Sequence, residues 1–136
     1  MTYDRFVGEV QSRARLGSQG AAVRAIQATL QTLAERLDPG ERKDLASQLP
    51  REFASFMQTP DEAARMSLDE FFHKVSGREQ EDLPASVYHA RVVIEVLQEA
   101  VSAGEIADVL CQLPAEWAPL FAGSQGELKL PAGATR

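Results

Sequence analysis

The chain has 136 residues and a single cysteine; 44% of its residues are apolar, 25% are charged, and its net charge is −6 at neutral pH. This length fits one globular domain with its own core, and the composition excludes wholesale disorder, a collagen-like chain and a disulfide scaffold. The acidic balance argues against general binding to duplex DNA or to an anionic membrane surface.

The first 57 residues predict four helical segments. An apolar face with helical spacing starts at Tyr3 and is broken at Gly17, after which Ser18 is placed to cap a second helix. Asp38 and the proline after it predict the start of a third helix. Pro50 then opens a short fourth segment. The apolar stripe of the second helix consists of Val23, Ile26, Leu30, Leu33 and Leu37.

The second half uses similar signals. Ser67 and Glu70 have the spacing of a capping box, and a polar loop is expected over 77–82. Pro84 is placed to start a long helix that is apolar nearly all round, so we expect residues 84–101 at the centre of the fold. Another capping box is predicted from Ser102 to Glu105.

The chain also aligns with itself. Residues 20–57 match residues 84–121 without gaps at an offset of 64 residues. We therefore expect one all-α domain over 1–121, with about eight short helices in two pseudo-repeated halves, 1–57 and 67–121, around one shared core. Residues 122–136 lack periodicity and are expected to form a flexible C-terminal tail, in which 127–130 could dock.

The most distinctive repeated motif is Gln-Leu-Pro-x-Glu-aromatic-Ala, which begins at Gln48 and again at Gln112. A structural interpretation explains it as a proline that starts a helix, followed by Glu52 or Glu116 as a capping carboxylate. A functional interpretation makes the two corners a docking surface for a partner.

Residues that could carry chemistry are scarce. Cys111 is the only thiol and is expected to be buried and inert, and His73 and His89 are the only imidazoles. These three residues lack the paired spacing of a metal site. The acidic pairs Asp61-Glu62, Asp69-Glu70 and Glu81-Asp82 lie where helix starts or loops favour acids, and the glycine-rich segment 17–20 lacks the residues of a P-loop. We therefore assign no catalytic, cofactor-binding or metal-binding residue and expect no cofactor.

Charge is unevenly distributed. Residues 1–60 contain eight basic and seven acidic residues, whereas residues 61–136 contain six basic and thirteen acidic residues. The arginines of the first two expected helices, Arg5, Arg13, Arg15 and Arg24, could form a basic patch, but arginines scattered over solvated faces are commoner. Nucleic-acid binding is therefore not expected, and the acidic second half is the better place for a protein partner.

The tandem pattern resembles a bacterial family known as the domain of unknown function 2267. The matching features are Tyr3-x-x-Phe6-x-x-x-Val10, the helix from Ala28 to Leu37, and the Gln48-Leu49-Pro50 corner with its echo at Gln112. The resemblance covers residues 1–122 and implies a small, all-helical bacterial protein. It implies no reaction, cofactor or catalytic residue.

Two functions remain open from the sequence. The first is a non-catalytic, helical protein-interaction or regulatory module with an unidentified protein partner. The alternative is a small-ligand-binding protein or enzyme with a site between the repeats, where Tyr88, His89, Glu95 and Cys111 would be the first suspects. A homo-oligomer formed through an exposed apolar strip is also open. No signal-peptide pattern and no run of roughly 20 apolar residues is present, so we expect a cytoplasmic protein without a membrane span.

Overall fold

The computed structural model describes residues 1–126 and confirms the predicted all-α fold: these residues form eight helices and no strand. In chain order the helices are α1 (Tyr3–Arg13), α2 (Gln19–Arg36), α3 (Pro39–Gln48), the 3-10 helix η1 (Arg51–Met57), α4 (Leu68–Glu79), α5 (Leu83–Ala100), α6 (Ala103–Gln112) and the 3-10 helix η2 (Ala115–Phe121). None of these helices combines the length and apolarity needed to cross a bilayer.

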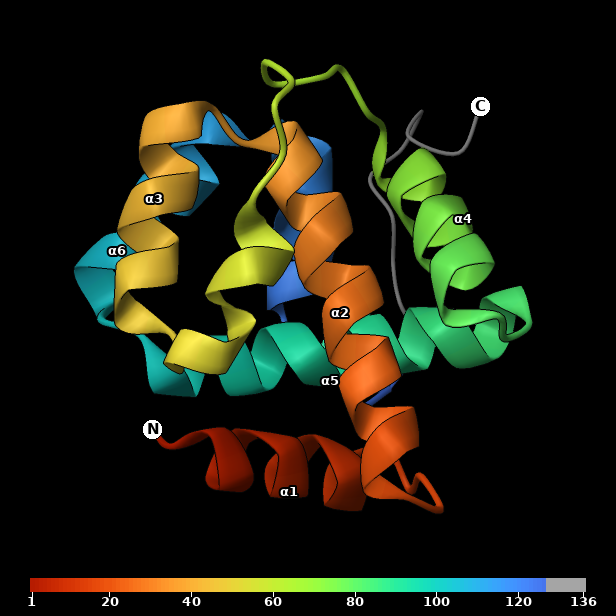
Figure 1. Cartoon of the computed structure of the whole chain (residues 1–136). Helices are drawn as coiled ribbons and strands as arrows, with labels where there is room; N and C mark the ends of the chain where they lie inside the picture. The colour runs from red at the N-terminus through yellow and green to blue at the C-terminus, as the bar shows by residue number, and fades with distance from the viewer. Residues whose placement is uncertain (127–136) are drawn as a thin grey trace.

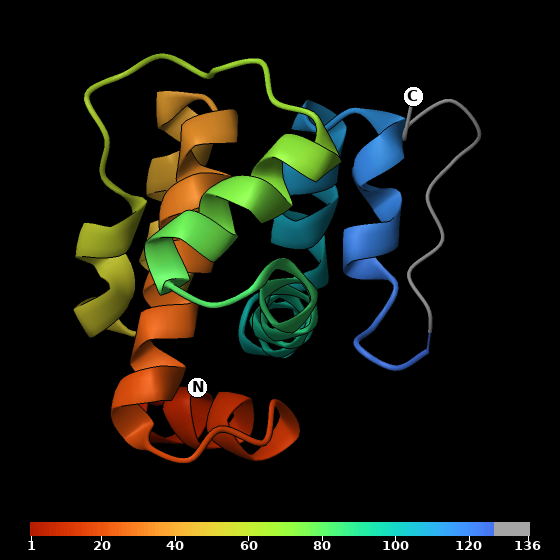
Figure 2. The same cartoon turned by 90° about the vertical axis from the view of Figure 1, so that its right-hand side faces the viewer.

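Helix α5 lies at the centre of the fold, as its sequence predicts. Figure 2 looks along its axis and shows α1, α2, α4 and the η2 segment around it. Its apolar side chains are fully buried at Val92, Val93, Ile94, Val96 and Leu97. A helix with apolar residues on every side needs partners on every side, and α5 has them.

Helix α2 is more deeply buried than its apolar stripe predicts. It crosses α5 and packs against α1, α4 and η1 (Figure 1). Thr29 and Thr32 are fully buried beside the stripe, and the Thr32 hydroxyl donates to the Ala28 carbonyl oxygen at 2.7 Å. Small and weakly polar residues therefore form a second buried face of α2, which the spacing of its large apolar residues does not predict.

The predicted N-caps of α2, α3, α4 and α6 form, but only Ser67 makes a complete capping box. At the starts of α3 and α6 the cap N–H is bound by a glutamine from the other half of the chain. The Asp38 N–H donates to Gln112 Oε1 at 3.0 Å, and the Ser102 N–H donates to Gln48 Oε1 at 2.8 Å. The capping box predicted from Ser102 to Glu105 is therefore only half formed.

The Gln-Leu-Pro corners fold as turns into 3-10 helices. Pro50 and Pro114 hold the cap positions, and no side chain caps η1 or η2, so the capping role predicted for Glu52 and Glu116 is wrong. The aromatic residues of the motif, Phe53 and Trp117, are fully buried, and the indole N–H of Trp117 donates to the Met66 carbonyl oxygen at 3.1 Å.

The loop predicted over 77–82 is shorter than expected. Helix α4 continues through Gly77 and ends at Glu79, and the C-cap residue Gln80 has a left-handed φ of +61°. The extension places the Glu79 side chain inside the protein, where only 1% of the residue is exposed. A buried polar network with α5 therefore outweighs the local preference of these polar residues for a loop.

The two halves contain helices in the same order, and three of the four pairs have equal lengths, while α1 has 11 residues and α4 has 12. Helices α2 and α5 have 18 residues each, α3 and α6 have 10 each, and η1 and η2 have 7 each. We interpret this agreement, together with the self-alignment, as an internal repeat.

The first residues of the expected tail are held against α5. The Arg91 guanidinium donates to the carbonyl oxygens of Gly123, Gln125 and Gly126, and Ser124 donates to Glu95 Oε2 from both its backbone N–H and its hydroxyl. The rest of the expected tail, 127–136, including the candidate docking segment 127–130, lies outside the described residues.

Replacing Gln48 or Gln112 with alanine should destabilise the fold by about 1 kcal/mol each, because a helix cap N–H loses its acceptor. Urea unfolding of each variant measures the change in the free energy of unfolding. Gln19→Ala, at an exposed position on α2, is the matched control and should change little. Equal effects at all three positions would contradict the capping role.

Candidate functional site

The residues first suspected of forming a site between the halves do not assemble into one. Tyr88 donates its hydroxyl to the Arg13 carbonyl oxygen at 2.6 Å, and Glu95 is bound by Arg13 and Ser124. Cys111 lies on α6 and is exposed, so the prediction that it is buried is wrong. The tyrosine and glutamate thus have structural partners at the α1–α5 seam, and the Cys111 thiol lies apart from them on α6.

His89 belongs to a buried polar network between α4 and α5. Its Nδ1 lies 2.5 Å from Glu79 Oε2, and the Ser86 hydroxyl donates to Glu79 Oε1 at 3.0 Å. All three residues are at least 93% buried. The serine bonds to the carboxylate rather than to the imidazole, so the network does not activate a nucleophile and instead joins two helices.

Arg13 carries most of the electrostatics of the α1–α5 seam. Its guanidinium donates to Glu9, Glu95 and Glu99 at 2.7–3.0 Å. The bond to Arg13 lowers the pKa of Glu99. Three carboxylates therefore surround one of the arginines considered for a basic patch, which removes its positive charge from any such surface.

Removing the imidazole of the buried network should cost about 3 kcal/mol or more, because the buried Glu79 carboxyl loses its nearest partner. His89→Ala is therefore expected to unfold at much lower urea concentration than the parent chain. His73→Ala is the control, since His73 is exposed on the same pair of packed helices. Similar urea midpoints for the two variants would contradict the proposed contribution of the network to the free energy of unfolding.

A groove lies on the outer side of α3, between that helix, η1 and the segment that follows. It has a volume of about 520 Å³ and is lined by Pro39, Arg42, Lys43, Ala46, Ala54, Met57, Gln58, Thr59 and Pro60. Five of these residues are apolar, two are cationic and none is acidic. In a chain with 20 acids and 14 bases, that lining is unusually positive.

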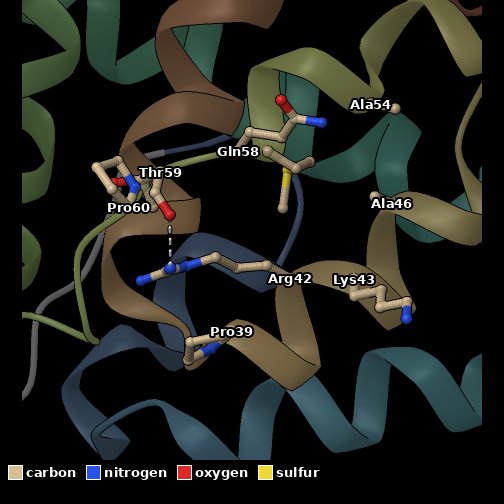
Figure 3. Close-up of a pocket in the computed structure, with 9 residues that line it drawn as sticks. Pro39, Arg42, Lys43, Ala46, Ala54, Gln58, Thr59 and Pro60 are labelled. Carbon is tan, nitrogen blue, oxygen red and sulfur yellow. Dashed lines mark hydrogen bonds between the residues drawn. The ribbon is translucent and has the colours of Figure 1, made fainter.

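The positive character of the groove comes from Arg42, which is only 5% exposed. Its Nε donates to the Ala34 carbonyl oxygen at 2.5 Å, and its Nη1 donates to those of Thr59 and Asp61 at 3.3 and 2.7 Å. Figure 3 shows the guanidinium extending toward Thr59 while Lys43 points away from it. Within residues 1–126 no carboxylate pairs with Arg42 and its Nη2 has no partner, so its full charge lies at the wall of the groove.

A second unusual group lies on the opposite side of α3, where α3 and α6 run side by side (Figure 1). Glu41 of α3 and Glu105 of α6 face each other, and Asp108 of α6 lies beside them. One carboxylate oxygen from each residue falls within 4.8 Å of the other two. Both glutamates are buried, with 9% and 6% exposed, whereas Asp108 is exposed.

The crowding of acids changes the titration of this group. Close contact with the Glu105 carboxyl, which can share a proton, raises the pKa of Glu41 to about 7. Burial and the charges of Glu105, Asp108 and Asp44 act in the same direction. At lower pH one proton between the glutamates relieves their repulsion, and at higher pH the repulsion remains.

The free energy of unfolding should therefore contain a component that falls as pH rises. Between the ordinary pKa of 4.5 and the folded value of about 7, the folded chain binds more protons at Glu41 than the unfolded chain does. The stabilisation is fully present below 4.5 and is lost by about pH 7. Glu41→Gln removes the titrating group, so the difference in stability between variant and parent should shift in favour of the variant from pH 5 to pH 8.

Urea unfolding at pH 5 and pH 8, in buffer with a chelator, provides this measurement. Glu52→Gln removes an exposed carboxylate outside the cluster and should leave the pH dependence of the parent unchanged. A Glu41→Gln variant with the same pH dependence as the parent would contradict the raised pKa.

The sequence predicts neither the Arg42 groove nor the acidic group at the α3–α6 contact. Glu41 stands three residues after the predicted cap Asp38, a spacing that favours a local capping role, and no local pattern marks Arg42 as a residue that is buried without a counter-ion. One signal was present: a glutamate stands at position 41 and again at position 105 of the self-alignment, whereas Arg42 aligns with Ile106.

The comparison with protein families gives a clear result. The family model described as "Uncharacterized conserved protein (DUF2267)" matches residues 3–120, which is most of the chain. The chain therefore belongs to this family, and the resemblance inferred from its motifs is confirmed. No curated protein matches it.

Proposed function

We propose that this member of the DUF2267 family is a non-catalytic interaction module that binds an acidic peptide segment of a protein partner in the groove beside α3. The observation that carries the proposal is the buried, unpaired charge of Arg42 at a groove wall that is otherwise largely apolar. A buried cation surrounded only by carbonyl oxygens attracts an anionic ligand more strongly than a solvated surface lysine does.

The lining residues define the chemistry of the ligand. Ala46, Ala54 and Met57 provide contacts for apolar side chains, and the exposed Lys43 extends the positive charge toward solvent. Open grooves with apolar walls and a few charged groups suit short peptide segments that place apolar anchors beside acidic residues. This location differs from the acidic second half that the sequence favoured as a partner site.

The alternative function, a ligand or catalytic site between the two halves, has less support. Tyr88, His89 and Glu95 lie on α5 but bond to different partners, Cys111 lies on α6, and the groove beside α3 is lined by residues 39–60, none of which belongs to the second half. The buried carboxyl–imidazole network is closed by its own hydrogen bonds.

A second groove, of about 670 Å³, is lined by Tyr88 and Arg91 of α5 and by Arg15, but all three N–H-bearing nitrogens of the Arg91 guanidinium already donate to carbonyl oxygens. Support for a binding module therefore rests on the groove beside α3, where Arg42 Nη2 has no partner within residues 1–126.

A selection from a displayed peptide library, with the full chain as bait, tests the proposal. Enriched peptides should be acidic with apolar anchors, and a synthetic copy should bind more weakly as salt concentration rises. Ala46→Leu places a larger side chain in the groove and should weaken binding at least ~10-fold; leucine already stands at the aligned position 110 of the second half. Lys43→Glu should also weaken peptide binding, because it reverses a positive charge of the groove.

Two controls separate the groove from the rest of the surface. Ala118→Leu enlarges an exposed alanine on η2, and Arg51→Glu reverses an exposed charge outside the groove lining. Both should leave the affinity of the selected peptide near that of the parent. The proposal is overturned if no peptide is enriched, or if the enriched peptides bind the groove variants and the parent equally well.

A further inference from the structure

The acidic group between α3 and α6 contains carboxylate oxygens that have no partner. Glu41 Oε2 and Glu105 Oε2 are both buried, and neither receives a hydrogen bond from an N–H or O–H donor within residues 1–126. Leaving a buried carboxylate oxygen without a partner is costly, and such oxygens are rare unless something else binds them.

No cationic side chain within residues 1–126 forms an ion pair with this group. None of the seven ion pairs formed by the described residues includes Glu41, Glu105 or Asp108. Two of the group's three carboxylates are buried, so the α3–α6 contact brings acidic groups together in a space with little access to water.

We propose that Glu41, Glu105 and Asp108 form a binding site for a Ca²⁺-sized divalent cation. Ca²⁺ prefers oxygen ligands at about 2.4 Å, so oxygens on opposite sides of the ion lie about 4.8 Å apart. The three carboxylate oxygens lie within that span of one another. One ion can therefore contact an oxygen of each residue, and two of these residues, Glu41 and Glu105, each have a buried oxygen with no other partner within residues 1–126.

The arrangement also explains why one acid is exposed. The two buried glutamates approach the ion from separate helices, and Asp108 approaches from the solvent side, where water can complete a coordination shell of six to eight oxygens. A site with three side-chain ligands from two rigid helices should bind weakly, with a Kd on the order of 10⁻⁴ M.

The site would link the two halves of the chain. Glu41 belongs to α3 and Glu105 to α6, so a bound ion joins residues 64 positions apart and adds to the two glutamine caps at the same contact. Ion binding should therefore stabilise the folded chain as a whole, which gives a readout independent of any partner.

The test is a titration of the chelator-treated full chain with CaCl₂ at pH 7.5, followed by calorimetry and by thermal unfolding. Saturable binding of one ion and a rise in Tm of roughly 5 °C at about 1 mM CaCl₂, ten times the expected Kd, are expected. MgCl₂ should bind more weakly, because Mg²⁺ requires closer and more regular ligands.

Variants separate this site from nonspecific ion binding. Glu105→Gln and Glu41→Gln should remove the Ca²⁺-dependent rise in Tm while raising the Tm of the ion-free chain, because charge repulsion is relieved. Asp108→Asn changes an exposed residue and should weaken binding at least ~5-fold without affecting the fold. The exposed acid variant Glu62→Gln should behave as the parent chain does.

Two results would overturn the proposal. One is a parent chain whose Tm does not change with CaCl₂ at pH 7.5, which would leave a shared proton as the sole means of relieving repulsion between the glutamates. The other is a Ca²⁺ response that persists in both Glu105→Gln and Asp108→Asn.

Discussion

The exchange of glutamine caps between α3 and α6 determines which side chains meet at the contact of the two halves. Gln48 and Gln112 each reach the N-terminal residue of the other half's helix, so the bonds run in both directions across one contact. Gln112 Nε2 also donates to Asp38 Oδ2 at 2.6 Å. A glutamine can accept from a cap N–H without bringing charge, and it thereby replaces the glutamate that a local capping box would use. Glu41 and Glu105 are consequently available to face each other.

Helix α3 separates two opposite electrostatic environments. Glu41 and Arg42 are adjacent in sequence, yet consecutive helical residues point in different directions and do not face each other. The glutamate lies toward α6, and the arginine lies toward η1, where carbonyl oxygens of Ala34, Thr59 and Asp61 hold it. An ion pair between these neighbours would have neutralised both. Because the helix keeps them apart, one side of α3 is strongly acidic and the other carries an uncompensated positive charge.

The sequence predicts what depends on neighbouring residues. The serine and aspartate caps, the apolar faces and the buried aromatics of the two corners all follow from spacing within one or two helical turns. Gln48 bonds to a residue 54 positions away and Gln112 to one 74 positions away, and no local pattern encodes such contacts. The position of Glu79 in a helix was not predicted for a related reason. Its polar sequence neighbours favour a loop, whereas its hydrogen-bond partners on α5 favour a longer α4. The exposure of Cys111 likewise depends on which side of α6 meets the core.

The differences between the halves carry as much information as their similarities. On the interpretation of the chain as a repeat, the residues that are the same at aligned positions include Glu41 with Glu105 and Gln48 with Gln112. These are the residues that meet at the α3–α6 contact, and a contact between two similar units requires the same chemistry from both. The groove residues differ: Arg42 aligns with Ile106, Lys43 with Ala107 and Ala46 with Leu110. Residues that hold the halves together are thus shared, whereas the charge and the space of the groove belong to the first half alone. A structural requirement would apply to both halves, so this asymmetry favours a binding role for the groove over a purely architectural one.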